Sequence, residues 1–292
     1  MLSLHTNFAS LSAQNSIGNT QSNLSTSMTR LSTGFRVNSA MDDAAGLQIA
    51  TRLKAQTSGM TVAMSNTQNS TSMLQTAEGA FNEVTNMLVR MKDLATQAAD
   101  ASSSTDDRKA MQAEYDALGT ELYNVMTNTT FGGTKLLGNG TGATGTLSSS
   151  MTFQIGASST EKMTFDVTSN LTSLNAKLTG LSSNFAATSI TNAAELTTGT
   201  AANGAIDKLE KAINDVSTIR SALGATANRL DHVNSNLSNI ATNTKAATGR
   251  IMDTDFATES SNMTASQMLL QAGTAMLKQS NSMSSMVMSL LQ

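Results

Sequence analysis

Apolar residues recur every seven positions along most of this chain, and the repeat is longest within residues 44–99. There it passes through Leu53, Met60, Thr67, Leu74, Phe81, Leu88 and Ala95. A seven-residue repeat held over so many turns predicts a long helix that supercoils against partner helices. No proline interrupts the repeat, because the 292-residue chain contains none.

Two further helices are predicted by the same pattern. From about residue 205 the repeat passes through Leu209, Val216, Leu223, Leu230, Leu237, Thr244 and Ile251. Before the chain's midpoint, a shorter apolar seam passes through Met111, Tyr115, Leu118, Leu122 and Val125. Ser104 with Asp107 three residues later predicts a capping box at the start of this shorter helix. The long repeats must return on each other to bury their seams.

Both ends of the chain combine apolar residues at helical spacing with very few charges. Residues 1–29 contain no Asp, Glu, Lys or Arg, and residues 260–292 contain only Lys278. Gly34 is expected to end the first helix. The apolar positions that we predict to be polymerisation seams are Leu4, Phe8, Leu11, Ile17, Leu24, Leu31, Met263, Leu270, Leu277 and Leu291.

Depletion of charge is typical of interface cores rather than of free surfaces. We therefore expect the two ends to pack together and then against other copies of the chain. A lone pair of such helices buries too little apolar surface to offset its ordering entropy, so the ends of a free monomer are expected to be disordered.

The middle of the chain changes period. The pattern in residues 151–167 predicts two short strands around a polar turn. The Ser- and Thr-rich residues 168–204 are expected to form only a short variable surface segment. The predicted fold is mainly α: an elongated antiparallel coiled-coil bundle of N- and C-terminal helices with a small β-hairpin region in the middle. The predicted domains are inner terminal helices (1–43 with 255–292), a helical rod with the hairpin (44–167 with 205–254) and the variable segment (168–204).

Composition argues against several classes of function. Charged residues make up 13% of the chain, net charge is −3, and no basic-aromatic patch occurs, so we expect no nucleic-acid binding. Cysteine is absent, and the two histidines lie in different helical segments, so we expect no metal site. The adjacent Asp42 and Asp43 fit capping of the long helix better than acid–base chemistry. We expect no enzyme activity and no cofactor.

Membrane and targeting signals are also missing from the sequence. No apolar run reaches the length of a transmembrane helix, so no membrane partner is expected. No pattern of a cleaved signal peptide opens the sequence. Most of the 19 methionines fall on the seams, where we expect them to fill the core.

Three blocks, in this order, resemble bacterial flagellin: "LSTGFRVNSAMDDAAGLQIATRL" (31–53), "TAEGAFNEVTNMLVRMKDLATQAA" (76–99) and "RIMDTDFATESSNMTASQMLLQAGTAMLKQSN" (250–281). The segment "FQIGA" is similar to the family's β-hairpin. At Met41 the chain departs from a lysine that is frequent in the family. The resemblance implies a minimal two-domain flagellin with little or no outer-domain insertion.

The resemblance also implies a function and a set of partners. It implies a structural subunit that polymerises into the flagellar filament for motility, exported by the flagellar type III apparatus and therefore secreted and extracellular. The implied partners are other copies of the chain, the filament cap and hook-junction proteins, an export chaperone on the C-terminal segment and the host Toll-like flagellin receptor. The family's receptor motif matches Arg90, Leu94 and Glu114.

Two alternatives stay open at this point. A hook–filament junction protein of related ancestry would share these helices, but it would not polymerise indefinitely when salted out. A secreted coiled-coil adhesin or effector would bind a receptor as a stable monomer and would not grow onto filament seeds.

Overall fold

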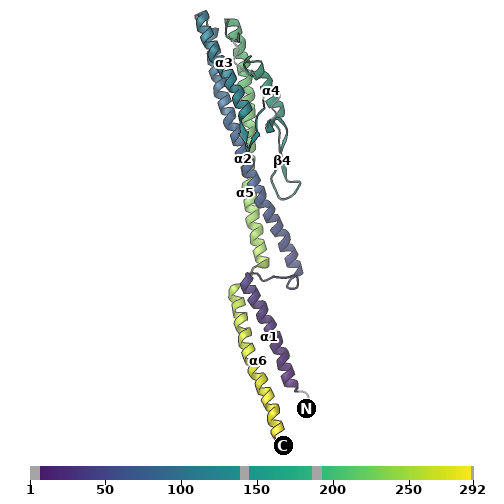
Figure 1. Ribbon diagram of the computed structural model, residues 1–292. Coiled ribbons are helices and arrows are strands. Elements are labelled where there is room, and N and C mark those ends of the chain that lie inside the picture. Colours follow the sequence, from purple (N-terminus) through teal and green to yellow (C-terminus); the bar gives the residue numbers. More distant parts are fainter. Residues whose placement is uncertain (1–6, 139–144, 186–192, 291–292) are drawn as a thin grey trace. The chain divides into compact units, whose positions relative to one another are not determined.

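The computed structural model describes residues 7–138, 145–185 and 193–290, and it is mainly helical (Figure 1). The helices are α1 (Phe8–Thr33), α2 (Ala44–Ala99), α3 (Thr105–Asn128), α4 (Thr168–Thr179), α5 (Gly199–Met252) and α6 (Phe256–Leu290). The strands form two antiparallel pairs, β1 (Thr130–Phe131) with β2 (Thr134–Lys135) and β3 (Met151–Gln154) with β4 (Lys162–Phe165). The predicted fold class, helical halves around a small β-hairpin region, is confirmed.

The chain divides into two compact units. Residues 1–57 and 242–292 form what we call the terminal unit, and residues 58–241 form the central unit. Helices α2 and α5 contribute residues to both units. The three-part domain assignment made from the sequence stays a prediction.

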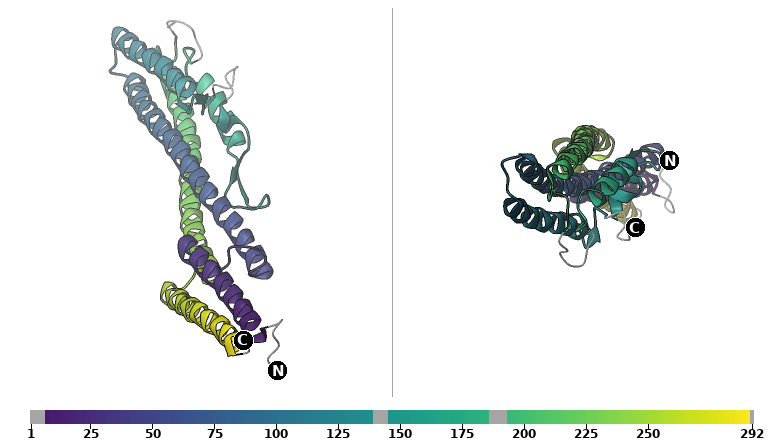
Figure 2. Two further views of the ribbon diagram at one scale, coloured as in Figure 1. Left: turned by 60° about the horizontal axis from the view of Figure 1, so that its bottom comes forward. Right: turned by 90° about the horizontal axis from the view of Figure 1, so that it is seen from above.

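The central unit has an extensive apolar core. Helices α2, α3 and α5 lie side by side, with α4 and the β3–β4 hairpin against them (Figures 1 and 2). The predicted seven-residue repeats supply this core, because these repeat positions are all buried: Met60, Thr67, Leu74, Phe81, Leu88, Ala95, Leu209, Val216, Leu223, Leu230 and Leu237. Helices α2 and α5 run antiparallel, since Lys92 pairs with Glu210 and Glu78 pairs with Arg220.

Helix α3 begins where the sequence predicts. The Ser104 hydroxyl accepts a hydrogen bond from the Asp107 amide at 3.1 Å, and the Asp107 carboxylate accepts one from the Ser104 amide at 3.0 Å. The predicted capping box is therefore confirmed. The Ser104 hydroxyl and amide both stabilise the charged carboxylate, which lowers the pKa of Asp107 below its ordinary value.

Residues 168–204 contain more structure than the sequence pattern indicated. They form α4 and then a stretch that is fastened to α3 by Gln112. The Gln112 amide donates to Asp116 at 2.8 Å and to Glu195 at 2.9 Å, while its oxygen accepts the Leu196 amide at 2.6 Å. Helix α5 then begins at Gly199 rather than near residue 205. The contacts of Gln112 with Glu195 and Leu196 join residues that are far apart in the sequence, so no local pattern predicts them.

Candidate assembly surface and receptor patch

Helices α1 and α6 of the terminal unit pack against each other through one heptad stripe each, which we call the inner stripes. On α1 the inner stripe consists of Ser10, Ala13, Ile17, Thr20, Leu24, Ser27 and Leu31, all partly or fully covered. On α6 it consists of Glu259, Met263, Ser266, Leu270, Gly273, Leu277 and Ser280, which are covered likewise. The structure therefore places six predicted seam residues, Ile17, Leu24, Leu31, Met263, Leu270 and Leu277, where the two helices face each other.

The inner stripes do not build an apolar core. Among the side chains described in α1 and in α6 through Met283, the two that are buried are polar or charged, Ser27 and Glu259, each 6% exposed. The leucine and isoleucine positions of the stripes stay half-buried and alternate with Ser, Thr, Ala and Gly. Burial of apolar surface is the main stabilising contribution in folding. The isolated helix pair therefore lacks most of the stabilisation that the central unit has.

Polar contacts set the alignment of the pair at each end. The Asn7 side chain accepts the Ser10 amide at 3.1 Å, which caps α1, and donates to the Ser280 carbonyl at 3.2 Å. At the other end, Arg30 lies 3.8 Å from the buried Glu259 carboxylate. These contacts fix which turns of the two antiparallel helices face each other.

The connectors of the terminal unit also pair with each other. Gly34 ends α1 in the left-handed region at φ 75°, the conformation in which glycine commonly ends helices. The predicted end of the first helix is therefore confirmed. The Gly34 carbonyl accepts the Thr254 amide at 3.0 Å, and the Arg36 amide donates to Met252 at 2.6 Å. Backbone pairing therefore joins the segment after α1 to the segment before α6.

Of the two carboxylates predicted to cap the long helix, Asp43 does so, whereas Asp42 binds the connector before it. The Asp43 carboxylate accepts the Gly46 amide at 2.8 Å and so caps α2. The Asp42 carboxylate accepts the Asn38 and Ser39 amides at 3.0 and 2.9 Å. These two backbone donors lower the pKa of Asp42.

The terminal helices also carry an exposed apolar surface, which we call the outer face. On α6 it contains Leu269, Met276 and Met283, spaced seven apart, with Met268 beside them. Leu269 and Met276 each precede an inner-stripe residue by one position, which puts them about 100° around the helix from that stripe. On α1 the outer face contains Phe8 and Leu11. Met28 is also exposed, but it lies beside the inner stripe, about 40° around the helix from Leu24.

The composition of these helices leaves the outer face almost without charge. The only charged residues in α1 and α6 are Arg30, Glu259 and Lys278. The predicted seam residues Phe8 and Leu11 are 82% and 66% exposed, so they lie on this face. Leu4 and Leu291 lie outside the described residues. Exposed apolar patches of this kind mark interaction sites.

The predicted receptor residues divide into two environments. Arg90 of α2 and Glu114 of α3 form an ion pair at 2.7 Å, and their side chains are 55% and 46% exposed. Leu94 is only 3% exposed and belongs to the core of the central unit. The structure brings Arg90 and Glu114 together on the surface, while Leu94 supports the helix from inside.

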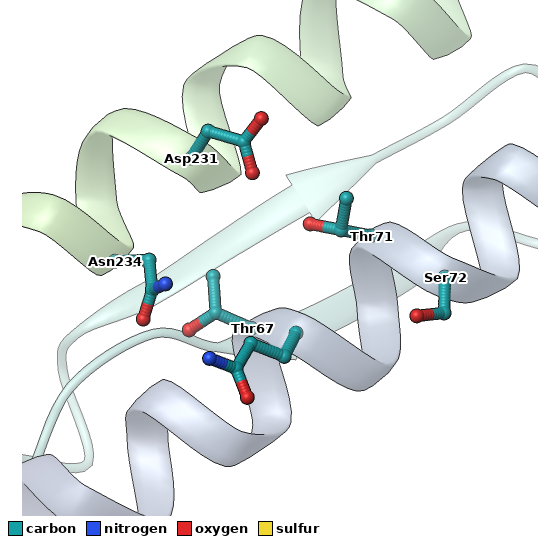
Figure 3. Close-up of a pocket in the computed structure, with 6 residues that line it drawn as sticks. Thr67, Thr71, Ser72, Asp231 and Asn234 are labelled. Atoms are coloured by element: carbon teal, nitrogen blue, oxygen red, sulfur yellow. The ribbon is translucent and has the colours of Figure 1, made fainter.

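A polar layer interrupts the core between α2 and α5 (Figure 3). A cavity of about 190 Å³ is lined by Thr67, Gln68, Thr71, Ser72, Asp231 and Asn234. The Thr67 hydroxyl donates to the Ala63 carbonyl of its own helix at 2.5 Å, and the buried Asn234 Oδ1 has no hydrogen-bond partner among the described residues. The layer separates the main core from a small cluster of Met60, Ala63 and Leu237.

The described residues offer neither a metal site nor a membrane-spanning helix. Over residues 7–138, 145–185 and 193–290, no group of three or more His, Cys, Asp or Glu side chains is arranged to hold a metal ion. In the same part of the chain, no helix combines the length and the apolar character that crossing a membrane requires.

A charge-poor helix pair with an exposed apolar face, joined to a well-packed antiparallel helical unit, is typical of a self-associating structural protein. Comparison with known proteins gives its family. The model of the bacterial flagellin N-terminal helical region matches residues 4–141, and that of the C-terminal helical region matches residues 206–291. The chain belongs to the bacterial flagellin family and is a structural subunit of the flagellar filament, which lies outside the cell.

Individual relatives agree with this assignment. Flagellin A of Vibrio anguillarum is 33% identical over 387 aligned residues, and polar flagellin C of Vibrio parahaemolyticus serotype O3:K6 is 32% identical over 390, each alignment covering 100% of both chains. Both alignments are longer than this chain, so the relatives contain residues that have no counterpart here. This agrees with the minimal, two-domain type.

A solved structure of a flagellar hook-associated protein from Vibrio parahaemolyticus is similar in fold. It has a TM-score of 0.55 at 17% identity, and the match covers 73% of this chain and 100% of that chain. At this identity the likeness concerns the fold alone.

Proposed function

We propose that the outer face of α1 and α6 is the contact through which copies of this chain polymerise. The observation that carries the proposal is the contrast between the two units: the central unit buries a large core, whereas the terminal helices leave Phe8, Leu11, Leu269 and Met276 exposed. A second copy is the fitting occupant, because both surfaces of such a contact are then apolar and free of charge.

The inner and outer positions have different roles in this proposal. Ile17, Leu24, Leu270 and Leu277 hold α1 to α6, whereas the outer face holds neighbouring subunits together. Because the pair lacks an apolar core, we propose that residues 1–43 and 255–292 become fully ordered only on polymerisation. The seam role of Leu4 and Leu291 stays a prediction, because both lie outside the described residues.

Charge substitutions on the outer face test the proposal. Leu269→Lys and Met276→Lys place an ammonium group where the neighbouring copy would bury it, and burying an unpaired charge is strongly unfavourable. The control is Met41→Lys. It makes the same substitution as Met276→Lys, but at a methionine that is 97% exposed in a connector. We expect salt-induced polymerisation to be lost in the first two variants and kept in the control. Normal polymerisation of Leu269→Lys would overturn the proposal.

The same assay separates this proposal from the alternatives. A filament subunit elongates filament seeds without limit, whereas a hook–filament junction protein stops after a few layers. An adhesin or effector does not add to seeds at all. Electron microscopy of the reassembled protein distinguishes these outcomes.

We also propose that the host Toll-like flagellin receptor recognises the central unit around Arg90 and Glu114. Their ion pair is exposed on two adjacent helices, so a partner can reach both groups. Leu94 would act indirectly, since its side chain lies in the core. In a reporter-cell assay, Arg90→Ala should weaken the response to monomer, whereas Lys109→Ala, which breaks another exposed pair on α3, should not. No response to wild-type monomer would contradict this proposal.

The remaining partner proposals concern the unassembled subunit. An export chaperone would cover the exposed apolar positions of α6 before secretion through the type III apparatus, and the filament cap and hook-junction proteins would meet the same helices during growth. The exposed Leu269 and Met276 support this, because an unassembled apolar face needs protection from aggregation.

A further inference from the structure

The methionines whose side chains the structure describes range from buried through half-buried to exposed. The chain contains no cysteine and no tryptophan, so its 19 methionine thioethers are its most readily oxidised side chains. Several fill the core as predicted, among them Met60, Met91, Met111, Met126 and Met163. Others are exposed, namely Met28, Met41, Met268, Met276 and Met283. Four of these exposed residues lie on the terminal helices.

The concentration is highest on the outer face of α6. Met268, Met276 and Met283 are 61%, 67% and 58% exposed. They share the helix with few charges, since only Glu259 and Lys278 are charged there. An oxidant in solution therefore reaches the sulfur atoms of an unassembled subunit directly.

We propose that Met268, Met276 and Met283 form an oxidant-sensitive modification site, at which a peroxide converts the thioethers to sulfoxides and thereby blocks polymerisation. The proposal rests on the proposed role of the outer face as the polymerisation contact. It adds a regulation of that contact by the redox state of its environment.

The chemistry is balanced with hydrogen peroxide as the oxidant. A lone pair of the methionine sulfur attacks one peroxide oxygen, an S–O bond forms and the O–O bond breaks. The transferred hydroxyl loses its proton to the leaving hydroxide, which gives one sulfoxide and one water. Sulfur loses two electrons, and the peroxide gains them.

The consequence follows from the change in polarity. A sulfoxide is a strong hydrogen-bond acceptor, and burying it against an apolar, uncharged surface leaves it without a donor. The core methionines escape because no oxidant reaches them. A filament should resist the same treatment, since polymerisation covers the outer face, so the unassembled subunit is the vulnerable state.

The experiment uses full-length protein treated with hydrogen peroxide as a monomer and, separately, as a filament. Mass spectrometry locates the sulfoxides, and light scattering measures the critical concentration for polymerisation. The protected variant combines Met268→Leu, Met276→Leu and Met283→Leu, because Leu and Met have similar volume and hydrophobicity. The matched control is Met41→Leu, which removes, among the described residues, the most exposed thioether outside the terminal helices.

We expect the critical concentration of treated wild-type monomer to rise about tenfold or more. The triple variant should change far less, Met41→Leu should respond as wild type does, and methionine sulfoxide reductase should restore the treated wild type. Normal polymerisation of monomer carrying sulfoxides at these positions would overturn the proposal, as would failure of the reductase to restore it. If Leu269→Lys blocks polymerisation while oxidised protein still polymerises, only the redox proposal fails.

Discussion

Gly273 of α6 packs against Ile17 of α1 so closely that a methyl group on Gly273 would lie 2.9 Å from Ile17 Cγ1. This distance is shorter than carbon–carbon contact allows, so the two helices can approach this closely only because residue 273 has no side chain. The contact lies in the middle of the inner stripes. It explains how a pair with few large apolar residues can still pack at short range.

A side chain at position 273 should therefore weaken the pairing of the terminal helices. Gly273→Ala forces Ile17 or the helix to move, and we expect a raised critical concentration for polymerisation. Gly79→Ala is the matched control, since it makes the same change in helix α2 with no atom within 4 Å of the new methyl group. Light-scattering measurements on both variants should differ, and equal behaviour would show that the close contact has no role in assembly.

The capping box of α3 should contribute measurably to stability. Ser104→Ala removes the hydroxyl that accepts the Asp107 amide, and we expect it to lower the free energy of unfolding by about 1 kcal/mol. Ser65→Ala is the control, because Ser65 is exposed in the interior of α2. Chemical denaturation, followed through the helical signal of the central unit, measures the free energy of unfolding of both variants. A loss no greater than that of the control would mean that α3 does not need this cap.

Tyr115 should make stability depend on alkaline pH. Its hydroxyl donates to the Leu181 carbonyl at 3.0 Å, and burial, followed by the negative charges of Glu195 and Asp116, raises its pKa above the ordinary value of 10.0. A raised folded-state pKa gives stability that is complete below the unfolded-state pKa and is lost as pH rises above it. The free energy of unfolding should therefore fall as the pH rises above about 10.

Tyr115→Phe removes the titrating group. It should cost about 1 kcal/mol at neutral pH through the lost hydrogen bond, and its stability should fall less steeply above pH 10 than that of the wild type. Tyr123→Phe is the control that keeps Tyr115 in place. Identical alkaline profiles for wild type and Tyr115→Phe would contradict the assignment.

The polar layer at Thr67 should cost stability. Thr67→Val places a methyl group in a core position that is 1% exposed, and we expect the free energy of unfolding to rise by about 1 kcal/mol. Thr76→Val is the matched control. The hydroxyls of Thr67 and Thr76 each donate to the carbonyl four residues earlier, but Thr76 is exposed. The difference between the two variants isolates the effect of burial. Destabilisation by Thr67→Val alone would show that the polar layer is stabilising.

Much of this fold could be predicted from the sequence, because its determinants are local and periodic. The repeat predicts α2 within its observed limits, Ala44 to Ala99. The cap at Ser104 and the left-handed Gly34 follow from residue type and spacing. A seven-residue period also identifies the buried face of each helix, so the core of the central unit can be predicted from the sequence.

The remainder depends on contacts between distant residues. Gln112 fastens the segment at Glu195 to α3, and nothing near either residue indicates the other. The burial of Leu94, and the separation of Phe8 from the stripe that contains Ile17, depend on how α-helices face each other in space. A repeat predicts that a face is apolar, but it does not say which partner covers that face.

We propose that the terminal helices depend on neighbouring subunits for their stability. Hydrogen–deuterium exchange, compared between monomer and filament, tests it most directly. We predict that amides in residues 8–33 and 256–290 exchange rapidly in the monomer and become protected in the filament, while those of residues 74–98 and 205–230 are protected in both. Equal protection of the terminal helices in monomer and filament would contradict the claim.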